Sequence, residues 1–248
     1  VLGVACFGAL GLALSAVAGS AEYALFTFAL PLALLLLIGA TTATGLLPGT
    51  RVEEQMIFVP SMIAFGVIVA AYVNLGAKLA TLRHDGVLKR IRTTPLPASA
   101  YLSGVLGSTA ATTLAITASV MAIGGFAFHA LPRAEGLPEL AGGLALGVAC
   151  FGALGLALSA VAGSAESAAP IANASYLPLA IMSGIFAPNF PVPHWLSVVV
   201  GLFPVRALAQ ILQQSYTPVA HASPTDLLVL LAWTAAGCAL AVWRFKWH

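Results

Sequence analysis

The most conspicuous shortage in this 248-residue sequence is charge: only 7% of its residues are Asp, Glu, Lys or Arg, whereas 60% are hydrophobic. Soluble domains carry about 25% charged residues, and a water-facing surface cannot be built from so few. Lipid, in contrast, accepts apolar side chains on the outside of helices. The composition therefore excludes a soluble protein. It predicts an all-α integral membrane protein with no separate soluble domain of useful size.

Several catalytic and ion-binding signatures are also missing. The sequence contains no G-x-x-x-x-G-K-[ST], so we expect no ATP site in this chain, and no H-E-x-x-H or Cys-x-x-Cys, so we predict no metal site. Three cysteines, Cys6, Cys150 and Cys238, lie in apolar runs and are interpreted as core or lipid-facing residues. A proton- or sodium-coupled carrier usually binds its ion through ionisable side chains deep in its spans. No acidic pair lies deep in an apolar stretch of this sequence. These absences disfavour an ion-coupled carrier and an intramembrane enzyme.

Six apolar stretches are long enough to cross a bilayer, which takes about 20 helical residues. We predict spans at 23–45, 57–81, 100–130, 142–163, 168–187 and 225–242. Basic residues are concentrated around the 82–99 loop and at the C-terminus, so the positive-inside rule places both in the cytoplasm. Four crossings separate these two segments, which makes the parity consistent. The connections 46–56, 131–140 and 188–224 then face outward.

The 82–99 loop contains the stretch DGVLKRIRTTPLP. Its apolar residues Val87, Leu88 and Ile91 are spaced for one face of a short helix, and Pro95 ends that helix. The pattern predicts a short amphipathic helix on the cytoplasmic surface between two spans. A basic loop that only sets topology and attracts anionic lipid is the alternative.

These residues resemble the intracellular coupling loop of the ABC-2 type exporter permeases, in which an acidic residue and a glycine precede a helix that ends in Thr-Pro. The form here is most similar to the drug-exporter branch, the daunorubicin-resistance-type permeases. It departs from many members in having no second acidic residue after Gly86. In the family this loop docks on the ATPase subunit, and the resemblance implies that role for Arg83, Asp85, Gly86, Leu88, Lys89, Arg90, Arg92, Thr93 and Thr94.

A second stretch, residues 183–218, is similar to the end of the same family. It contains a break at Ser-Gly, a proline-rich loop, a short helix that opens near Trp195, and another amphipathic helix after Phe203-Pro204. Pro204 and Arg206 interrupt the apolar pattern, so we predict a re-entrant hairpin on the outer side rather than a clean span. An interfacial loop is the alternative.

The resemblance implies a six-helix ABC-2 (type V exporter) transmembrane domain over residues 23–248, in a bacterial plasma membrane. It implies two ATPase subunits, which hold ATP and magnesium, and a second permease subunit, identical or different. This chain would then export a hydrophobic drug or a lipid-like substrate, as in antibiotic resistance, without being an enzyme itself. It would contact membrane lipid and no nucleic acid. An ion-coupled secondary multidrug carrier and a non-transporting membrane scaffold are the alternatives.

Polar residues within the spans are the candidates for a substrate path. Asn173 and Tyr176 lie one turn apart on a helix that the family places at the seam between subunits, and Asn74 lies in the second span. For any single one of them helix packing is the favoured explanation, because Asn and Tyr connect neighbouring helices, and the Ser and Thr residues of the third span can bond to their own helix. A path lined mainly by apolar residues suits an amphiphilic substrate.

Residues 2–22 are identical to residues 146–166. The later copy fits the fourth span, where Gly147, Gly152 and Gly155 predict close helix packing. Identity stops abruptly at Tyr23, whereas the repeats of transporters diverge in sequence and keep corresponding flanks. We therefore treat 1–22 as an anomalous segment, in the place where the family has a basic amphipathic helix on the inner membrane surface.

Overall fold

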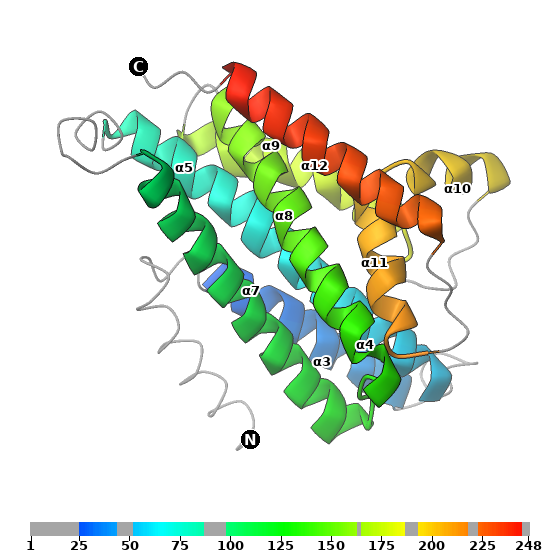
Figure 1. Ribbon diagram of the computed structural model, residues 1–248. Helices are drawn as coiled ribbons and strands as arrows, with labels where there is room; N and C mark the ends of the chain where they lie inside the picture. The colour runs from blue at the N-terminus through cyan, green and yellow to red at the C-terminus, as the bar shows by residue number, and fades with distance from the viewer. Residues whose placement is uncertain are drawn as a thin grey trace.

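The computed structural model describes residues 25–43, 52–86, 98–162, 165–186, 193–217 and 223–244, and its regular structure there is entirely helical. Figure 1 shows long helices packed side by side with two short helices at one end of the bundle. In chain order, the elements are η1 (Leu25–Ala29), α3 (Leu30–Ala43), α4 (Val52–Ile68), η2 (Val69–Asn74), α5 (Leu75–His84), α7 (Ala98–Phe128), η3 (Ala134–Gly136), α8 (Leu137–Val161), α9 (Ala165–Met182), α10 (His194–Gly201), α11 (Pro204–Gln214) and α12 (Pro224–Arg244).

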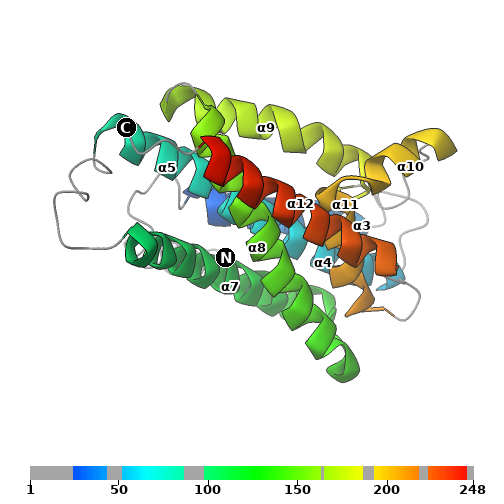
Figure 2. The same ribbon diagram turned by 45° about the horizontal axis from the view of Figure 1, so that its top comes forward.

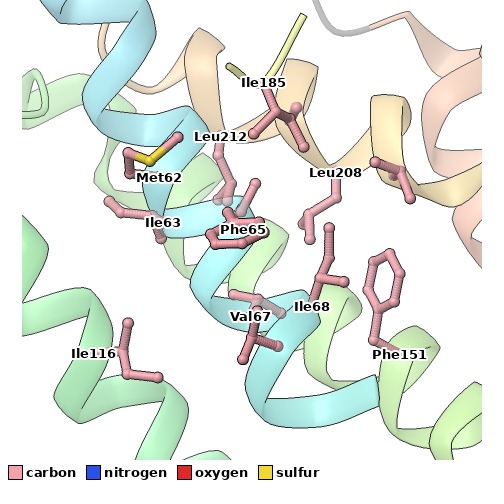
Figure 3. Packing of buried hydrophobic residues seen from close by; sticks show 14 of the residues in the cluster. Met62, Ile63, Phe65, Val67, Ile68, Ile116, Phe151, Ile185, Leu208 and Leu212 are labelled. Carbon is pink, nitrogen blue, oxygen red and sulfur yellow. The ribbon is translucent and has the colours of Figure 1, made fainter. Parts of the chain in front are cut away.

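The centre of the bundle is the second predicted span, in which α4, the π-helical turn η2 and α5 follow one another without a break. Its residues are apolar on all sides, and most of them are buried, as expected for a helix surrounded by other helices. Figure 3 shows the side chains that gather around α4 from α7, α8 and α11. The labelled residues of this core are Met62, Ile63, Phe65, Val67, Ile68, Ile116, Phe151, Ile185, Leu208 and Leu212.

Glycines of α8 let neighbouring helices approach closely. The sequence predicts this for Gly147, Gly152 and Gly155, and the structure confirms it for two of the three. A Cβ on Gly155 would lie 2.6 Å from the carbonyl oxygen of Ala71, and one on Gly147 would lie 2.8 Å from a methyl of Leu208. Gly152 has only ordinary contacts, the nearest at 3.6 Å. Helix α8 therefore packs backbone to backbone against the central helix, which suits association in lipid, where close packing through small residues, and not the hydrophobic effect, holds helices together.

Four helical stretches of the described chain are long and apolar enough to cross a membrane: 55–84, 103–128, 134–161 and 224–244. A fifth crossing is possible if the bent pair α10 and α11 counts as one span. Of the other predicted spans, the first contains a shorter apolar helix at Thr27–Leu37, and α9 does not satisfy the same test. The protein is thus a multi-pass membrane protein with four or five candidate spans, and the predicted number of six is not confirmed.

The two ends of the bundle hold different sets of connections. Figures 1 and 2 place the C-terminal ends of α5 and α12 and the start of α7 at one end. At the other end, the backbone N–H of Arg133 donates to the carbonyl of Ser215, so the connection before α8 meets the end of α11. This grouping agrees with the parity that the charge distribution predicts. The cytoplasmic orientation itself stays a prediction.

Two of the sequence predictions lie outside the described residues. The anomalous segment 1–22 is one, together with the amphipathic helix expected in its place. The other is most of the predicted coupling helix, because the described chain stops at Gly86 and resumes at Ala98.

Candidate functional site

The first part of the candidate site is the end of α5, immediately before the predicted coupling loop. The N–H of Asp85 donates to the carbonyl of Thr81 (2.9 Å), and the N–H of Gly86 donates to that of Arg83 (3.2 Å). Gly86 has a φ of +69° and a Cβ there would meet no atom within 4 Å, so glycine is favoured by conformation and not by space. His84 and Asp85 are exposed. The helix thus ends with a left-handed glycine that redirects the chain, and the acidic residue is available to a partner.

Arg83 points toward the bundle. Its Nη1 donates to the carbonyl oxygens of Ser159 (3.2 Å) and Ala160 (3.5 Å), in the last turn of α8. The last four carbonyls of a helix have no partner within it and carry partial negative charge, so a guanidinium stabilises this end. The sequence prediction grouped Arg83 with the residues that face the ATPase, whereas the structure brings it onto α8.

The other predicted coupling residues lie outside the described residues: Leu88, Lys89, Arg90, Arg92, Thr93 and Thr94. Their docking role stays a prediction.

The second part of the candidate site surrounds η2, where the central helix meets η1 and α9. Asn74 donates from Nδ2 to Oγ1 of Thr27. The hydroxyls of Tyr72 and Ser175 are hydrogen-bonded at 2.8 Å, and Ser175 also donates to the carbonyl of Ala172. These contacts between helices fit the packing interpretation of the polar residues. The Tyr72–Ser175 bond was not foreseen, because no sequence pattern pairs residues 103 positions apart.

The two path candidates on α9 have different surroundings. Tyr176 is 3% exposed and its ring lies 6.1 Å from that of Phe65, inside the helix bundle. Asn173 is half-buried, and its Oδ1 is buried with no hydrogen-bond partner among the described residues. Neither observation tests whether they line a path, so that role stays a prediction for Asn74, Asn173 and Tyr176.

Hydroxyl side chains of α7 mostly bond to their own helix, as the sequence analysis allows. Each donates to a carbonyl four residues earlier, at 2.8 to 3.0 Å: Thr109, Thr112, Thr113 and Ser119. The buried Oγ1 of Thr117 has no such partner. Four of the five residues thereby satisfy their polar groups locally, which costs little in lipid.

The third part is the pair α10 and α11, which meet at an angle of 89°. Nη1 of Arg206 donates to the carbonyl of Ser197 at 2.6 Å, which ties α11 to α10 across the bend. From α12, Nε1 of Trp233 donates to the carbonyl of Leu202 at 2.8 Å, and its ring stacks on Phe203 at 5.7 Å. The bend lies where the sequence predicts it, and its position relative to a membrane stays a prediction.

Proline and tryptophan have distinct places in this pair. Pro204 is buried at the first turn of α11, where its missing N–H costs no hydrogen bond. Trp195, near the start of α10, is 67% exposed. An exposed indole beside apolar neighbours suits the interface between lipid and water.

Helix α11 lies deeper in the protein than an interfacial helix. Its apolar face is buried, and Nε2 of Gln213 donates to Oγ of Ser61 on α4 at 2.8 Å. The sequence analysis recognised the polar residues of α11 but not this partner. The bond connects the predicted hairpin to the central helix.

The described residues contain no group of three or more His, Cys, Asp or Glu side chains that could hold a metal ion. The acidic residue of α12, Asp226, accepts the backbone N–H of Ser223 at 2.8 Å, so it caps the helix. What these contacts can do is hold helices together and connect the coupling end to the rest of the bundle.

Comparison with known sequences gives one family. The sequence model described as "ABC-2 type transporter" matches residues 20–216, well over half of the chain. The match includes the end of α5, the central helix, α9 and the α10–α11 pair, and it stops before α12. No curated protein matches this sequence.

Proposed function

Since the chain belongs to the ABC-2 type transporter family, we propose that it is the permease subunit of an exporter that is driven by ATP hydrolysis on a separate subunit. Membership of the family implies a membrane component that works with an ATP-binding partner. The permease carries out no covalent chemistry. Its role is to offer two packings of the helix bundle, whose balance the nucleotide state of the partner shifts.

The observation that carries this proposal is the family match, which spans both the start of the coupling loop and the bent pair. The exposed Asp85 and the left-handed Gly86 support docking of the partner at this end. The low charge of the described spans supports an external energy source, since an ion-coupled carrier needs ionisable groups at membrane depth.

Within the family, we place the chain in the drug-exporter branch because of the loop sequence DGVLKRIRTTPLP. The cargo in this proposal is a hydrophobic drug or a lipid-like amphiphile that leaves the cytoplasm. The low charge and the high apolar content of the predicted spans favour such a molecule over a sugar or an ion. Two permease subunits, identical or different, surround the path and two ATPase subunits bind below them.

The test is co-purification followed by transport in inside-out vesicles. An ATPase subunit is expected to accompany the chain, and uptake of a fluorescent amphiphile is expected to require ATP and to survive a proton uncoupler. Replacing 85–92 by a Gly/Ser linker of equal length should abolish ATP-dependent uptake.

The control is a Gly/Ser replacement of 132–135 at the opposite end of the bundle. A replacement of 193–203 would be unsuitable, because it would remove the bend between α10 and α11. The 132–135 control should leave the ATPase subunit bound. Uptake that survives ATP depletion but not the uncoupler would instead identify an ion-coupled carrier. A chain that binds no ATPase and moves no cargo would be a scaffold.

A further inference from the structure

The central helix and α8 touch at three successive levels, the first in η2 and the next two in α5. Gly155 lies against the carbonyls of Ala71 and Tyr72, where a Cβ would be 2.6 Å and 3.2 Å from the two oxygens. One turn further, a Cβ on Gly76 would lie 2.6 Å from a methyl of Leu158. The third contact is that of Arg83 with the last turn of α8. The first two contacts are van der Waals contacts, whereas the third is a directional hydrogen bond.

Arg83 contacts two backbone carbonyls in the last turn of α8. The carbonyl of Leu158 accepts the N–H of Ala162, and the next two carbonyls, those of Ser159 and Ala160, accept a side-chain donor. Arg83 supplies it from a half-buried position, and Ser159 is 1% exposed. A charged donor at a helix C-terminus in a place with little water makes a stronger bond than a neutral one.

Helix α8 in turn is joined to α12. A Cβ on Gly237 would lie 3.0 Å from the backbone of Ala153, so these two helices also meet backbone to backbone. Figure 2 shows α12 lying along α8 over much of its length. Helix α12 carries Trp233, which donates to the carbonyl of Leu202 at the bend between α10 and α11, so direct contacts connect α8 to that bend.

From these contacts we propose that Arg83 is a positioning residue that ties the start of the coupling loop to α8. It does not bind the ATPase subunit. Through this clamp, a movement of the loop is passed to α8 and α12 instead of being lost as bending at the end of α5. The idea rests on the proposed function, because it requires that the loop receives a movement from an ATP-driven partner.

The experiment uses the permease with its co-purified ATPase subunit, reconstituted in vesicles, and compares Arg83→Ala, Arg83→Lys and the control Arg133→Ala. Arg133 forms an exposed ion pair with Glu135 at the other end of the bundle (2.7 Å). Three quantities are measured: retention of the ATPase subunit, cargo moved per ATP hydrolysed, and hydrogen exchange of the backbone amides of 159–162.

For Arg83→Ala we expect wild-type retention of the ATPase, a fall of about tenfold in cargo per ATP and about tenfold faster exchange in 159–162, since one charged hydrogen bond is lost. Arg83→Lys should restore part of the cargo moved per ATP and part of the slow exchange in 159–162. Arg133→Ala should change neither of these two quantities. Exchange survives as a readout even if transport in a variant is low for other reasons.

Loss of the ATPase subunit from Arg83→Ala, with unchanged exchange in 159–162, would overturn the inference, because Arg83 would then contact the partner. Unchanged cargo per ATP would overturn it as well. If the wild-type complex itself shows no ATP-driven transport, the proposed function fails, and the positioning role fails with it whatever the exchange result.

Discussion

At the scale of single residues, the glycines of α8 separate close packing from helix propensity. Gly155 and Gly142 lie on the same helix, but a Cβ on Gly155 would meet the backbone of Ala71 at 2.6 Å, whereas one on Gly142 would meet nothing within 4 Å. The same substitution at these two positions therefore tests opposite effects. The backbone carbonyl cannot rotate away as a side chain could, so the cost at Gly155 is unavoidable.

We predict that Gly155→Ala destabilises the protein by about 1–3 kcal/mol through overpacking. Gly142→Ala should be neutral or stabilising by about 0.5–1 kcal/mol, because alanine is the better helix former. Thermal unfolding in detergent, followed by tryptophan fluorescence, measures both. A shift of about 2–4 °C per kcal/mol is expected for a chain of this size. Equal unfolding temperatures for the two variants would contradict the close approach of α8 to η2.

At the scale of elements, the pair α10 and α11 shows how a bend is held. Proline at the start of α11 explains why one helix cannot continue through this point, but it does not fix the angle. The angle depends on two hydrogen bonds to backbone carbonyls, from Arg206 to Ser197 and from Trp233 to Leu202. One comes from within the pair and the other from α12, so the bend depends on both local and distant residues.

Replacing Arg206 by glutamine should loosen the bend, because a charged hydrogen bond worth about 1.5–3 kcal/mol is lost. We expect amide hydrogen exchange in 196–203 to rise by one to two orders of magnitude, about tenfold per 1.4 kcal/mol. Trp233→Phe is the matched variant: it keeps an aromatic ring against Phe203 and removes only the N–H donor, so a smaller rise is expected. Exchange that changes equally in α8 would point to general destabilisation instead.

At the scale of the whole molecule, the two ends of the bundle present different residues to the two sides of a membrane. Helices α5 and α12, whose last residues are His84 and Arg244, end at one end of the bundle, whereas η3, which contains Glu135, and the start of α12, which follows Ser223, lie toward the other. All four residues are exposed. Arg244 lies over the ring of Trp243 at 5.4 Å, as expected for an anchor at the membrane surface.

Single cysteines at these four positions, in a chain whose native cysteines are replaced by serine or alanine, test the topology with a membrane-impermeant maleimide. His84→Cys and Arg244→Cys should react only from the cytoplasmic side. Glu135→Cys and Ser223→Cys should react only from the outside, where the predicted topology places their connections. Within each of the two pairs, an even number of crossings separates the two positions, so both members should react from the same side. Reaction of His84→Cys and Arg244→Cys from opposite sides would refute the predicted parity.

Much of this architecture follows from the sequence, because lipid imposes a strong and local requirement. A stretch without charge must become a helix that satisfies its own backbone groups, and a proline or a glycine marks where that helix ends. The breaks at Ser183-Gly184 and at Pro204 were therefore predictable, as was the self-bonding of the α7 hydroxyls. The number of spans was not, since apolar length alone does not separate a crossing helix from one such as α9.

The sequence by itself determined the class of the protein, the family resemblance and the positions of most helices, because each depends on residues close together in the chain. Only the tertiary structure decided which side chains meet. Arg83 reaches α8, Tyr72 meets Ser175, and Gln213 meets Ser61 across separations of 76 to 152 residues. From the sequence alone, an arginine beside a basic loop is expected at the surface. Only the packing of α5 against α8 turns Arg83 toward the carbonyls at the end of a helix.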